Sequence, residues 1–262
     1  MRILFLGNNW LGWKILHWLK EQGEEIAGLV VHPPNRQKYG EEIIGCGCVD
    51  SAYVFDGSRI CEPETLEAIR DLQPEIGVSV LFGYILNQEF LELIPSGCVN
   101  IHPALLPYNR GAYPNVWSIV EGTPAGVTIH YIDEGVDTGD IIAQRQVEVE
   151  PVDTGGGLYR KLQEDAVDLF KKTWPLIRSG QPPRIPQKNN DGTCHRVRDV
   201  ERIDDIDPDR TYTARELIDI IRARTFPPYA GAYFKQRGRK VYLRLQLLYE
   251  EELRACDHAR CD

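Results

Sequence analysis

The chain lacks both a membrane-spanning stretch and an excess of positive charge. No apolar run approaches the ~20 residues of a spanning helix, and the run at residues 3–6 is too short for the apolar centre of a signal peptide. Asp and Glu number 39 against 30 Lys and Arg, so the net charge is −9. Because an acidic protein repels phosphates and anionic lipids, this composition argues against general binding to nucleic acid or to a membrane surface.

Disulfide and metal frameworks are also missing. Cys occurs seven times, an odd number, and the spacing matches no disulfide framework, which is typical of a reducing cytoplasm. Cys46-x-Cys48 is expected in a loop, and Cys256-x-His258-x-x-Cys261 belongs to a charged tail. We therefore predict a cytoplasmic protein without a metal site.

Two nucleotide-binding fingerprints are absent from the start of the chain. A strand at residues 2–6 leads through Gly7 to Gly12 into a helix, but the second glycine comes too late for the dinucleotide motif, and no Gly-Lys-Ser/Thr sequence follows. A second strand at residues 25–31 ends in His-Pro-Pro instead of the acid that binds a ribose, which disfavours an NAD-dependent enzyme. Residues 8–12 either bind an anion through main-chain N–H groups or cap the helix.

The first two thirds of the chain do contain alternating strand and helix patterns. Of its 262 residues, 42% are hydrophobic and 26% charged, as in ordinary globular proteins. Short apolar runs predict strands, and helical periodicity predicts helices. The expected strands are residues 2–6, 25–31, 53–55, 75–81, 99–102, 126–132 and 140–149. The expected helices include residues 63–72, 87–93 and 157–178. This order predicts an α/β fold, a Rossmann-like, mostly parallel sheet with helices on both faces.

A smaller unit follows a proline-rich link at residues 181–187. Residues 213–224 predict a helix, and residues 232–235 and 240–248 predict a hairpin. We therefore divide the chain into a main domain, residues 1–187, and a linker with a small C-terminal helix-and-hairpin appendage, residues 188–262. Between residues 210 and 244, nine Lys and Arg outnumber two acids; this patch either binds phosphate groups or is a solvated face.

Residues 98–140 carry the side chains with the clearest chemistry. Asn100 and His102 alternate on a predicted strand, so they share one face at its carboxyl end, where open parallel sheets bind ligands. An amide can stabilise an oxyanion, and an imidazole can accept the proton that an attacking amine loses. From these residues alone, a turn cap for Asn100 and a core position for His102 remain the alternative.

An acidic loop follows the next expected strand and runs from Asp133 to Asp140. Its glycines allow a tight turn and close approach to a ligand. Asp137 can orient an imidazole and favour its charged form. The spacing of the aspartates does not match a calcium loop, so a cation site is disfavoured.

This central stretch resembles the folate-dependent formyltransferase family, and the sugar N-formyltransferases most closely. The family pattern appears as Asn100-Ile101-His102, then Leu-Leu-Pro-Tyr-Asn-Arg-Gly at residues 105–111, then Asp-Glu-Gly-Val-Asp-Thr-Gly at residues 133–139. The resemblance implies a catalytic triad of Asn100, His102 and Asp137. It also implies formyl transfer from 10-formyltetrahydrofolate to a primary amine.

The same resemblance implies two binding sites. The donor would contact the loop formed by Phe82, Gly83, Tyr84 and Ile85, together with Asp133 and Gly135. The acceptor would contact Asn9, Trp10, Arg110 and Tyr113. We expect Arg110 and residues 8–12 to hold a diphosphate, because a guanidinium forms a bidentate pair with phosphate oxygens.

The C-terminal residues point to the acceptor. Only about 55 residues follow position 207, too few for the β-barrel of the tRNA-directed members beside a helix. Residues 217–225, 231–234 and 238–244 are similar to the C-terminal segment of sugar N-formyltransferases, which implies a nucleotide-linked amino sugar as acceptor and lipopolysaccharide biosynthesis as the process. Methionyl-tRNA is the alternative acceptor, and a non-catalytic folate- or nucleotide-binding protein is the alternative class. The hairpin edge and the resemblance together predict a homodimer.

Overall fold

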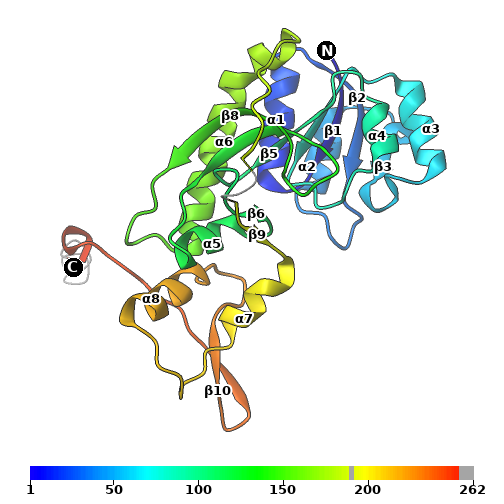
Figure 1. Cartoon of the computed structure of the whole chain (residues 1–262). Coiled ribbons are helices and arrows are strands. Elements are labelled where there is room, and N and C mark those ends of the chain that lie inside the picture. Colours follow the sequence, from blue (N-terminus) through cyan, green and yellow to red (C-terminus); the bar gives the residue numbers. More distant parts are fainter. Residues whose placement is uncertain (189–191, 254–262) are drawn as a thin grey trace, which may run out of the picture.

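A computed structural model describes residues 1–188 and 192–253, and it is built around one seven-stranded sheet (Figure 1). The strand order is β3-β2-β1-β4-β5-β7-β8. Five neighbouring strands are parallel: β1 (Arg2–Gly7), β2 (Glu25–Val31), β3 (Val54–Asp56), β4 (Ile76–Val80) and β5 (Cys98–His102). β7 (Ala125–Tyr131) and β8 (Ile141–Val147) extend the sheet in antiparallel fashion beside β5.

Helices cover both faces of this sheet. One apolar cluster unites the sheet with α1 (Asn9–Glu21), α2 (Gly40–Gly47), α5 (Pro114–Val120) and α6 (Gly155–Arg178). The other face packs against α3 (Pro63–Leu72) and α4 (Gln88–Glu92). The central parallel strands are continuous apolar runs because both of their faces are buried. The expected Rossmann-like α/β fold is confirmed.

Side-chain caps define where several helices begin. The side chain of Asn87 accepts a hydrogen bond from the main-chain N–H of Phe90 at the start of α4. Thr154 caps α6 by accepting from the N–H of Gly157 over 3.1 Å. Such caps satisfy main-chain donors that have no partner in the first turn of a helix. The caps therefore explain why predicted and observed helix starts agree closely in this part of the chain.

The C-terminal subdomain contains η4 (Val197–Val200), α7 (Glu201–Asp204), α8 (Ala214–Ala223) and a hairpin of β10 (Tyr233–Gln236) with β11 (Arg239–Tyr242). In Figure 1 it lies at the opposite end of the molecule from the N-terminus. The second hairpin strand is shorter than expected from residues 240–248. Leu243 still donates its N–H to Ala232, but the N–H of Leu245 donates to Thr225 Oγ1 instead of to the first hairpin strand, so the pairing ends there.

Other differences concern short elements. Two 3₁₀ turns, η1 (Ser51–Tyr53) and η2 (Gly57–Arg59), flank β3. The sequence did not predict α5, although Pro114 at its first turn is a common helix start. The segment Cys256–Cys261 considered above as a metal motif lies outside the described residues. None of the helices in the described parts is long and apolar enough to cross a membrane.

The link after α6 returns to the main domain instead of leaving it. Ile185 forms an antiparallel bridge with Ile141 at the start of β8. β9 (Cys194–His195) then pairs in parallel with β6 (Arg110–Gly111), the strand that follows β5. The expected boundary between residues 187 and 188 stays a prediction, and it lies within this returning segment.

Candidate active site

Three side chains from the predicted triad converge beyond the end of β5. The carboxylate of Asp137 lies 3.4 Å from Asn100 Nδ2 and 3.6 Å from His102 Nδ1. Asn100 and His102 approach it from the same face of the strand, as the alternation predicted. His102 is buried, and Asn100 is half-buried. The structure therefore brings together an amide donor, an imidazole and a carboxylate.

Asp137 is held as a carboxylate by its surroundings. Its φ of 53° is a left-handed conformation that aspartate tolerates better than most residues. Burial alone would raise the pKa of Asp137, but the nearby His102 and His130 and the N–H of Gly111, which donates to Oδ2 over 2.9 Å, hold this pKa well below its usual range. Asp137 is therefore a hydrogen-bond acceptor and a negative charge at any working pH.

His130 is a fourth member of this cluster that sequence reasoning missed. It is 2% exposed and pairs with Asn100 across β5 and β7. Its Nδ1 donates to the carbonyl oxygen of Tyr131 over 2.7 Å, and its Nε2 lies 3.1 Å from Asn100 Nδ2 and 3.5 Å from Asp137 Oδ1. The alternation of strand residues 126–132 contained the signal, since Thr128 and His130 share the face that meets Asn100 and His102.

The tautomer of His102 is set by the loop after β5. Its Nε2 lies 3.0 Å from the main-chain carbonyl oxygen of Asn109. Because a carbonyl only accepts, Nε2 is the donor in this contact. Nδ1, the nitrogen that faces Asp137, is then the atom left to exchange a proton.

The acidic loop is shaped by its own side chains. Asp133 Oδ1 accepts from the N–H of Gly135 over 3.1 Å and from Thr138 Oγ1 over 2.6 Å. Gly139 passes so near the carbonyl of Tyr131 that an added Cβ would lie 1.9 Å from its oxygen. The two residues expected to touch the donor, Asp133 and Gly135, thus lie in an exposed turn that fixes the path toward Asp137.

The loop after β4 contains Phe82, Gly83, Tyr84 and Ile85, which are also expected to contact the donor. Phe82 and Tyr84 pack edge-on against His32, and Gly83 donates its N–H to His32 Nε2 over 3.3 Å. Burial, together with nearby Arg36, lowers the pKa of His32, so its ring is a neutral acceptor. Among the described residues, no hydrogen bond engages the main-chain groups of Phe82 or Tyr84, and the buried hydroxyl of Tyr84 has no partner. Ile85 is 76% exposed at the loop tip.

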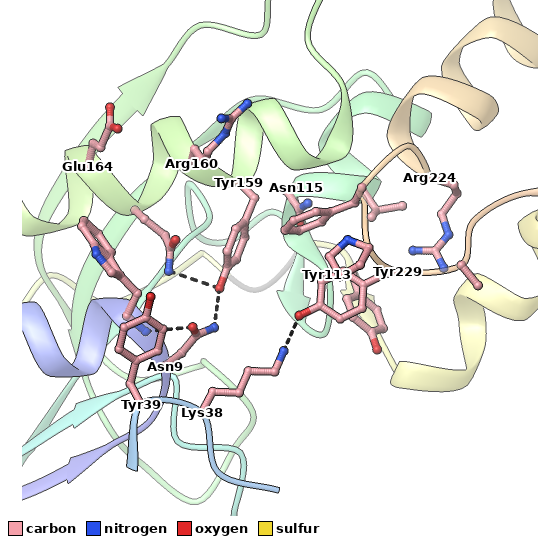
Figure 2. A pocket seen from close by; sticks show the side chains of 16 residues that line it. Asn9, Lys38, Tyr39, Tyr113, Asn115, Tyr159, Arg160, Glu164, Arg224 and Tyr229 are labelled. Carbon is pink, nitrogen blue, oxygen red and sulfur yellow. Dashed lines mark hydrogen bonds between the residues drawn. The ribbon is translucent and has the colours of Figure 1, made fainter. Parts of the chain in front are cut away.

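A cavity of about 800 Å³ lies between the main domain and the C-terminal subdomain (Figure 2). Its walls come from the starts of α1 and α2, from α5 and α6, and from the segment after α8. Aromatic side chains dominate the lining: Trp10, Tyr39, Tyr113, Tyr159, Phe226 and Tyr229. The volume lies within the range of small-molecule sites, and aromatic walls with a few polar groups are typical of them.

A polar network organises one wall of this cavity. Figure 2 shows Asn9 beside Tyr159, whose hydroxyl accepts from Asn9 Nδ2 over 3.0 Å and from Gln163 Nε2 over 3.2 Å. Asn9 Oδ1 accepts from the N–H of Trp10, which fixes the orientation of the amide. Burial raises the pKa of Tyr159 to about 12, so the phenol keeps its proton. Because both lone pairs are used, this proton is available to a ligand in the cavity.

The expected acceptor residues divide into two groups. Asn9, Trp10 and Tyr113 line the cavity, whereas Arg110 does not. Arg110 is 9% exposed, and its Nη2 donates to Gln187 Oε1 over 2.8 Å. The structure thus gives no support to placing a diphosphate on Arg110.

At the start of α1, three main-chain donors have protein partners. The N–H groups of Asn8 and Asn9 donate to the carbonyls of Val80 and Lys38, and that of Trp10 donates to Asn9 Oδ1. Asn8, which precedes the helix, makes no side-chain cap. Anion binding by residues 8–12 stays a prediction, and these three N–H groups are already engaged by neighbouring protein acceptors.

Three cationic side chains line the cavity wall: Lys38, Arg160 and Arg224. Lys38 reaches across to Tyr229, with Nζ 2.5 Å from the hydroxyl (Figure 2). Arg224 Nη2 pairs with Asp204 over 2.9 Å. Arg224 belongs to the basic patch expected at residues 210–244, whereas sequence reasoning missed Lys38 and Arg160 because segments far apart in sequence bring them together. Within residues 1–188 and 192–253, no group of three or more His, Cys, Asp or Glu could hold a metal ion.

Two family profiles match this chain. Residues 1–173 match the Formyl transferase profile, and residues 199–249 match the N-formyltransferase dimerization C-terminal domain. The first region contains the convergent Asn100, His102 and Asp137. The second contains the segment after α8 that lines the cavity. The resemblance deduced from the sequence is confirmed.

Relatives of both expected kinds are found. The chain is 30% identical over 249 residues to a methionyl-tRNA formyltransferase of Acetivibrio thermocellus, covering 93% of this chain and 79% of that protein. It is similar to a sugar N-formyltransferase from Shewanella sp. FDAARGOS_354, with a TM-score of 0.81 and 25% identity over 95% of this chain and 98% of that one. PseJ from Anoxybacillus kamchatkensis, solved with UDP-4,6-dideoxy-4-formamido-L-AltNAc and tetrahydrofolate, is 31% identical with a TM-score of 0.57, covering 77% and 89%.

Proposed function

The chain belongs to the formyl transferase family, and on that premise we propose that it moves a formyl group from 10-formyltetrahydrofolate to the amino group of a nucleotide-linked amino sugar. The observation that carries the proposal is the aromatic cavity, whose wall includes the C-terminal subdomain as well as the main domain. A nucleotide and a sugar need such an enclosed, mixed surface.

The triad supplies the chemistry in this proposal. The donor brings a formyl carbonyl carbon, and the amine of the acceptor attacks that carbon. Asn100 stabilises the developing oxyanion with the N–H now directed at Asp137, because that contact of 3.4 Å is long and weakly engaged. His102 Nδ1 takes the proton from the amine, and Asp137 stabilises the imidazolium that forms. The bond between the folate nitrogen and the formyl carbon then breaks, and the departing nitrogen receives this proton, which leaves tetrahydrofolate and the formylated amine.

The donor site in this proposal is the loop after β4. The main-chain groups of Phe82 and Tyr84, with Gly83 and Ile85 around them, offer donors and acceptors to the edge of a flat heterocycle. The buried, unpartnered hydroxyl of Tyr84 fits such a polar ligand. The tetrahydrofolate in the PseJ complex supports a folate-derived donor.

The acceptor occupies the cavity. Trp10 and Tyr113 supply apolar surface for base or sugar, as expected from the sequence, while Lys38 and Arg160 take the place of Arg110 as partners of the diphosphate. Tyr159 donates its free proton to a sugar or phosphate oxygen. The nucleotide sugar in the PseJ complex and the TM-score of 0.81 to the Shewanella enzyme support this substrate class.

A second candidate is methionyl-tRNA formyltransferase, because relatives at 30% identity carry that name. Its acceptor is a large polyanion, and its affinity would rest on phosphate neutralisation over a wide surface. The net charge of −9 disfavours that mode of binding. A protein that binds these ligands without catalysis is disfavoured by the convergence of Asn100, His102 and Asp137.

Thermal shift followed by turnover tests the proposal. We expect dTDP-, UDP- or GDP-linked amino sugars to raise the unfolding midpoint, since a ligand at about 100 times its Kd stabilises the folded state by about 2.7 kcal/mol. The binding sugar should then be formylated in the presence of 10-formyltetrahydrofolate. If only methionyl-tRNA accepts formyl, the sugar assignment is wrong. If no acceptor is formylated although ligands bind, the non-catalytic alternative holds.

The proposal includes a homodimer formed through the C-terminal subdomain. Val241 and Tyr242 on β11 and Ile218 on α8 are each at least 40% exposed, and the name of the matched C-terminal profile supports this role. Light scattering should give twice the chain mass of 29.9 kDa, and Val241→Asp should lower it to one chain. A wild-type particle of one chain mass at micromolar concentration would refute the dimer.

A further inference from the structure

The segment between α6 and the C-terminal subdomain crosses the catalytic loops. Residues 174–198 lie outside both matched family regions, which end at 173 and resume at 199. Nevertheless β9 in this segment pairs with β6, directly beside the loop that carries Asn109. Gly111 has a φ of 83°, and an added Cβ there would lie 2.3 Å from the carbonyl oxygen of His195, so the two chains are in close contact.

Gln187 is the first link between this segment and the triad. Its Nε2 donates to the main-chain carbonyls of Asp137 over 2.9 Å and of Gly139 over 2.8 Å. Its Oε1 accepts from Arg110. The orientation of the amide is unambiguous because carbonyls only accept and a guanidinium only donates. Gln187 therefore holds the main chain of Asp137 in its left-handed conformation.

Thr193 is the second link. Its Oγ1 accepts from the N–H of Asn109 over 2.8 Å and donates to Asn109 Oδ1 over 3.0 Å, and its carbonyl accepts from the N–H of Arg110. Asn109 is fully buried, has a φ of 56°, and directs its own carbonyl at His102 Nε2. Thr193 thus holds the carbonyl that sets the tautomer of His102.

We propose that Gln187 and Thr193 are positioning residues for formyl transfer: Gln187 acts through Asp137, and Thr193 acts through Asn109 on His102. The inference rests on the proposed function. It makes the link between the two matched regions part of the catalytic site. It also connects the C-terminal subdomain, which lines the acceptor cavity, to the groups that carry out the reaction.

The first test replaces Gln187. Gln187→Glu keeps the side-chain size and the hydrogen bond from Arg110. It replaces Nε2, which donates to the main-chain carbonyls of Asp137 and Gly139, by an oxygen that cannot donate to them. We expect Gln187→Ala to lower kcat at least about tenfold and Gln187→Glu to lower it further, because small displacements of catalytic groups cost about this much or more. The KM of the acceptor should stay within about twofold, since Gln187 does not line the cavity. Gln181→Ala, an exposed glutamine in the same link, is the matched control and should have wild-type kcat.

A double-mutant cycle separates positioning from general structural support. In an Asp137→Asn background, Gln187→Ala should cost less than about twofold in kcat, because the group through which it acts is already lost. If Gln187→Ala lowers kcat by the same factor in both backgrounds, or if Gln187→Glu has wild-type kcat, the inference is wrong for Gln187.

The second test replaces Thr193 and includes a measurement that needs no turnover. Thr193→Val should lower kcat at least about tenfold and Thr193→Ser should restore it, because only the hydroxyl bonds to Asn109. Nitrogen NMR of the histidine rings should show His102 protonated at Nε2 in the wild type, with this preference weakened in Thr193→Val. An unchanged His102 tautomer in that variant would overturn the role of Thr193. If wild-type protein formylates no amine but the NMR result holds, the proposed function fails, and only the control of the His102 tautomer by Thr193 through Asn109 stands.

Discussion

Removal of the Asp137 charge is the sharpest perturbation of the site. Asp137→Asn keeps the side-chain volume and can still accept the hydrogen bond from the N–H of Gly111 through its amide oxygen. It removes the negative charge 3.6 Å from His102 Nδ1. The variant should therefore fold normally but fail to stabilise positive charge on the imidazole.

The size of the effect follows from this geometry. The side chains of His102 and Asp137 are 8% and 15% exposed, so an effective dielectric constant of about 20 applies, and unit charges near 4 Å attract by about 4 kcal/mol. If half to all of this attraction develops in the transition state, its loss costs about 2 to 4 kcal/mol. Since about 1.4 kcal/mol is tenfold in rate, kcat should fall about 30- to 1000-fold.

Steady-state kinetics of formyl transfer to the amine substrate of the wild-type enzyme measure this fall in kcat. The KM of the acceptor should be nearly unchanged, because Asp137 does not line the cavity. Glu134→Gln removes a charge from an exposed position in the same loop and should leave kcat unchanged. A fall of less than tenfold in folded Asp137→Asn protein would refute charge stabilisation of His102 by Asp137.

Three further predictions concern the same residues and the cavity. Asn100→Ala and His102→Ala should each lower kcat at least about 10²-fold while circular dichroism stays native, and near-wild-type rates would contradict their roles. The pKa of Asp137 is lower in the folded than in the unfolded state, so its contribution to the free energy of unfolding is complete above the usual aspartate pKa near 4 and is lost as pH falls below it. In urea unfolding from pH 7 to 3, the wild type should therefore lose stability more steeply than Asp137→Asn, and equal slopes would contradict this. Tyr159→Phe should raise the Kd of the acceptor about tenfold by calorimetry, whereas Tyr53→Phe, an exposed tyrosine outside the cavity, should not; equal affinities in both variants would contradict the role of Tyr159.

Local sequence signals determined most of the sheet and its helices. β2 and α3 have the predicted bounds, because uninterrupted apolar runs and helical spacing act over a few neighbouring residues. α5 and the early end of β11 were missed. α5 is short, and the end of β11 depends on a hydrogen bond from Leu245 to Thr225 that hydropathy does not report.

The candidate triad was also accessible from the sequence. Alternation on β5 placed Asn100 and His102 on one face, and the family pattern added Asp137. These inferences depend on short spacings along one strand and on intact motifs. His130 had the same kind of signal, but the pairing of β7 against β5 was needed to recognise it.

Patterns along the chain were sufficient to predict the α/β class, the strand that carries Asn100 and His102, and the family of the chain. The folded structure was needed to find that Arg110 is bonded to Gln187, that Lys38 and Tyr229 meet across a cavity, and that Thr193 supports the residue facing His102. The physical reason is distance along the chain. Strand and helix patterns are local, whereas the partner of a polar side chain is chosen by the packing of segments up to 191 residues apart.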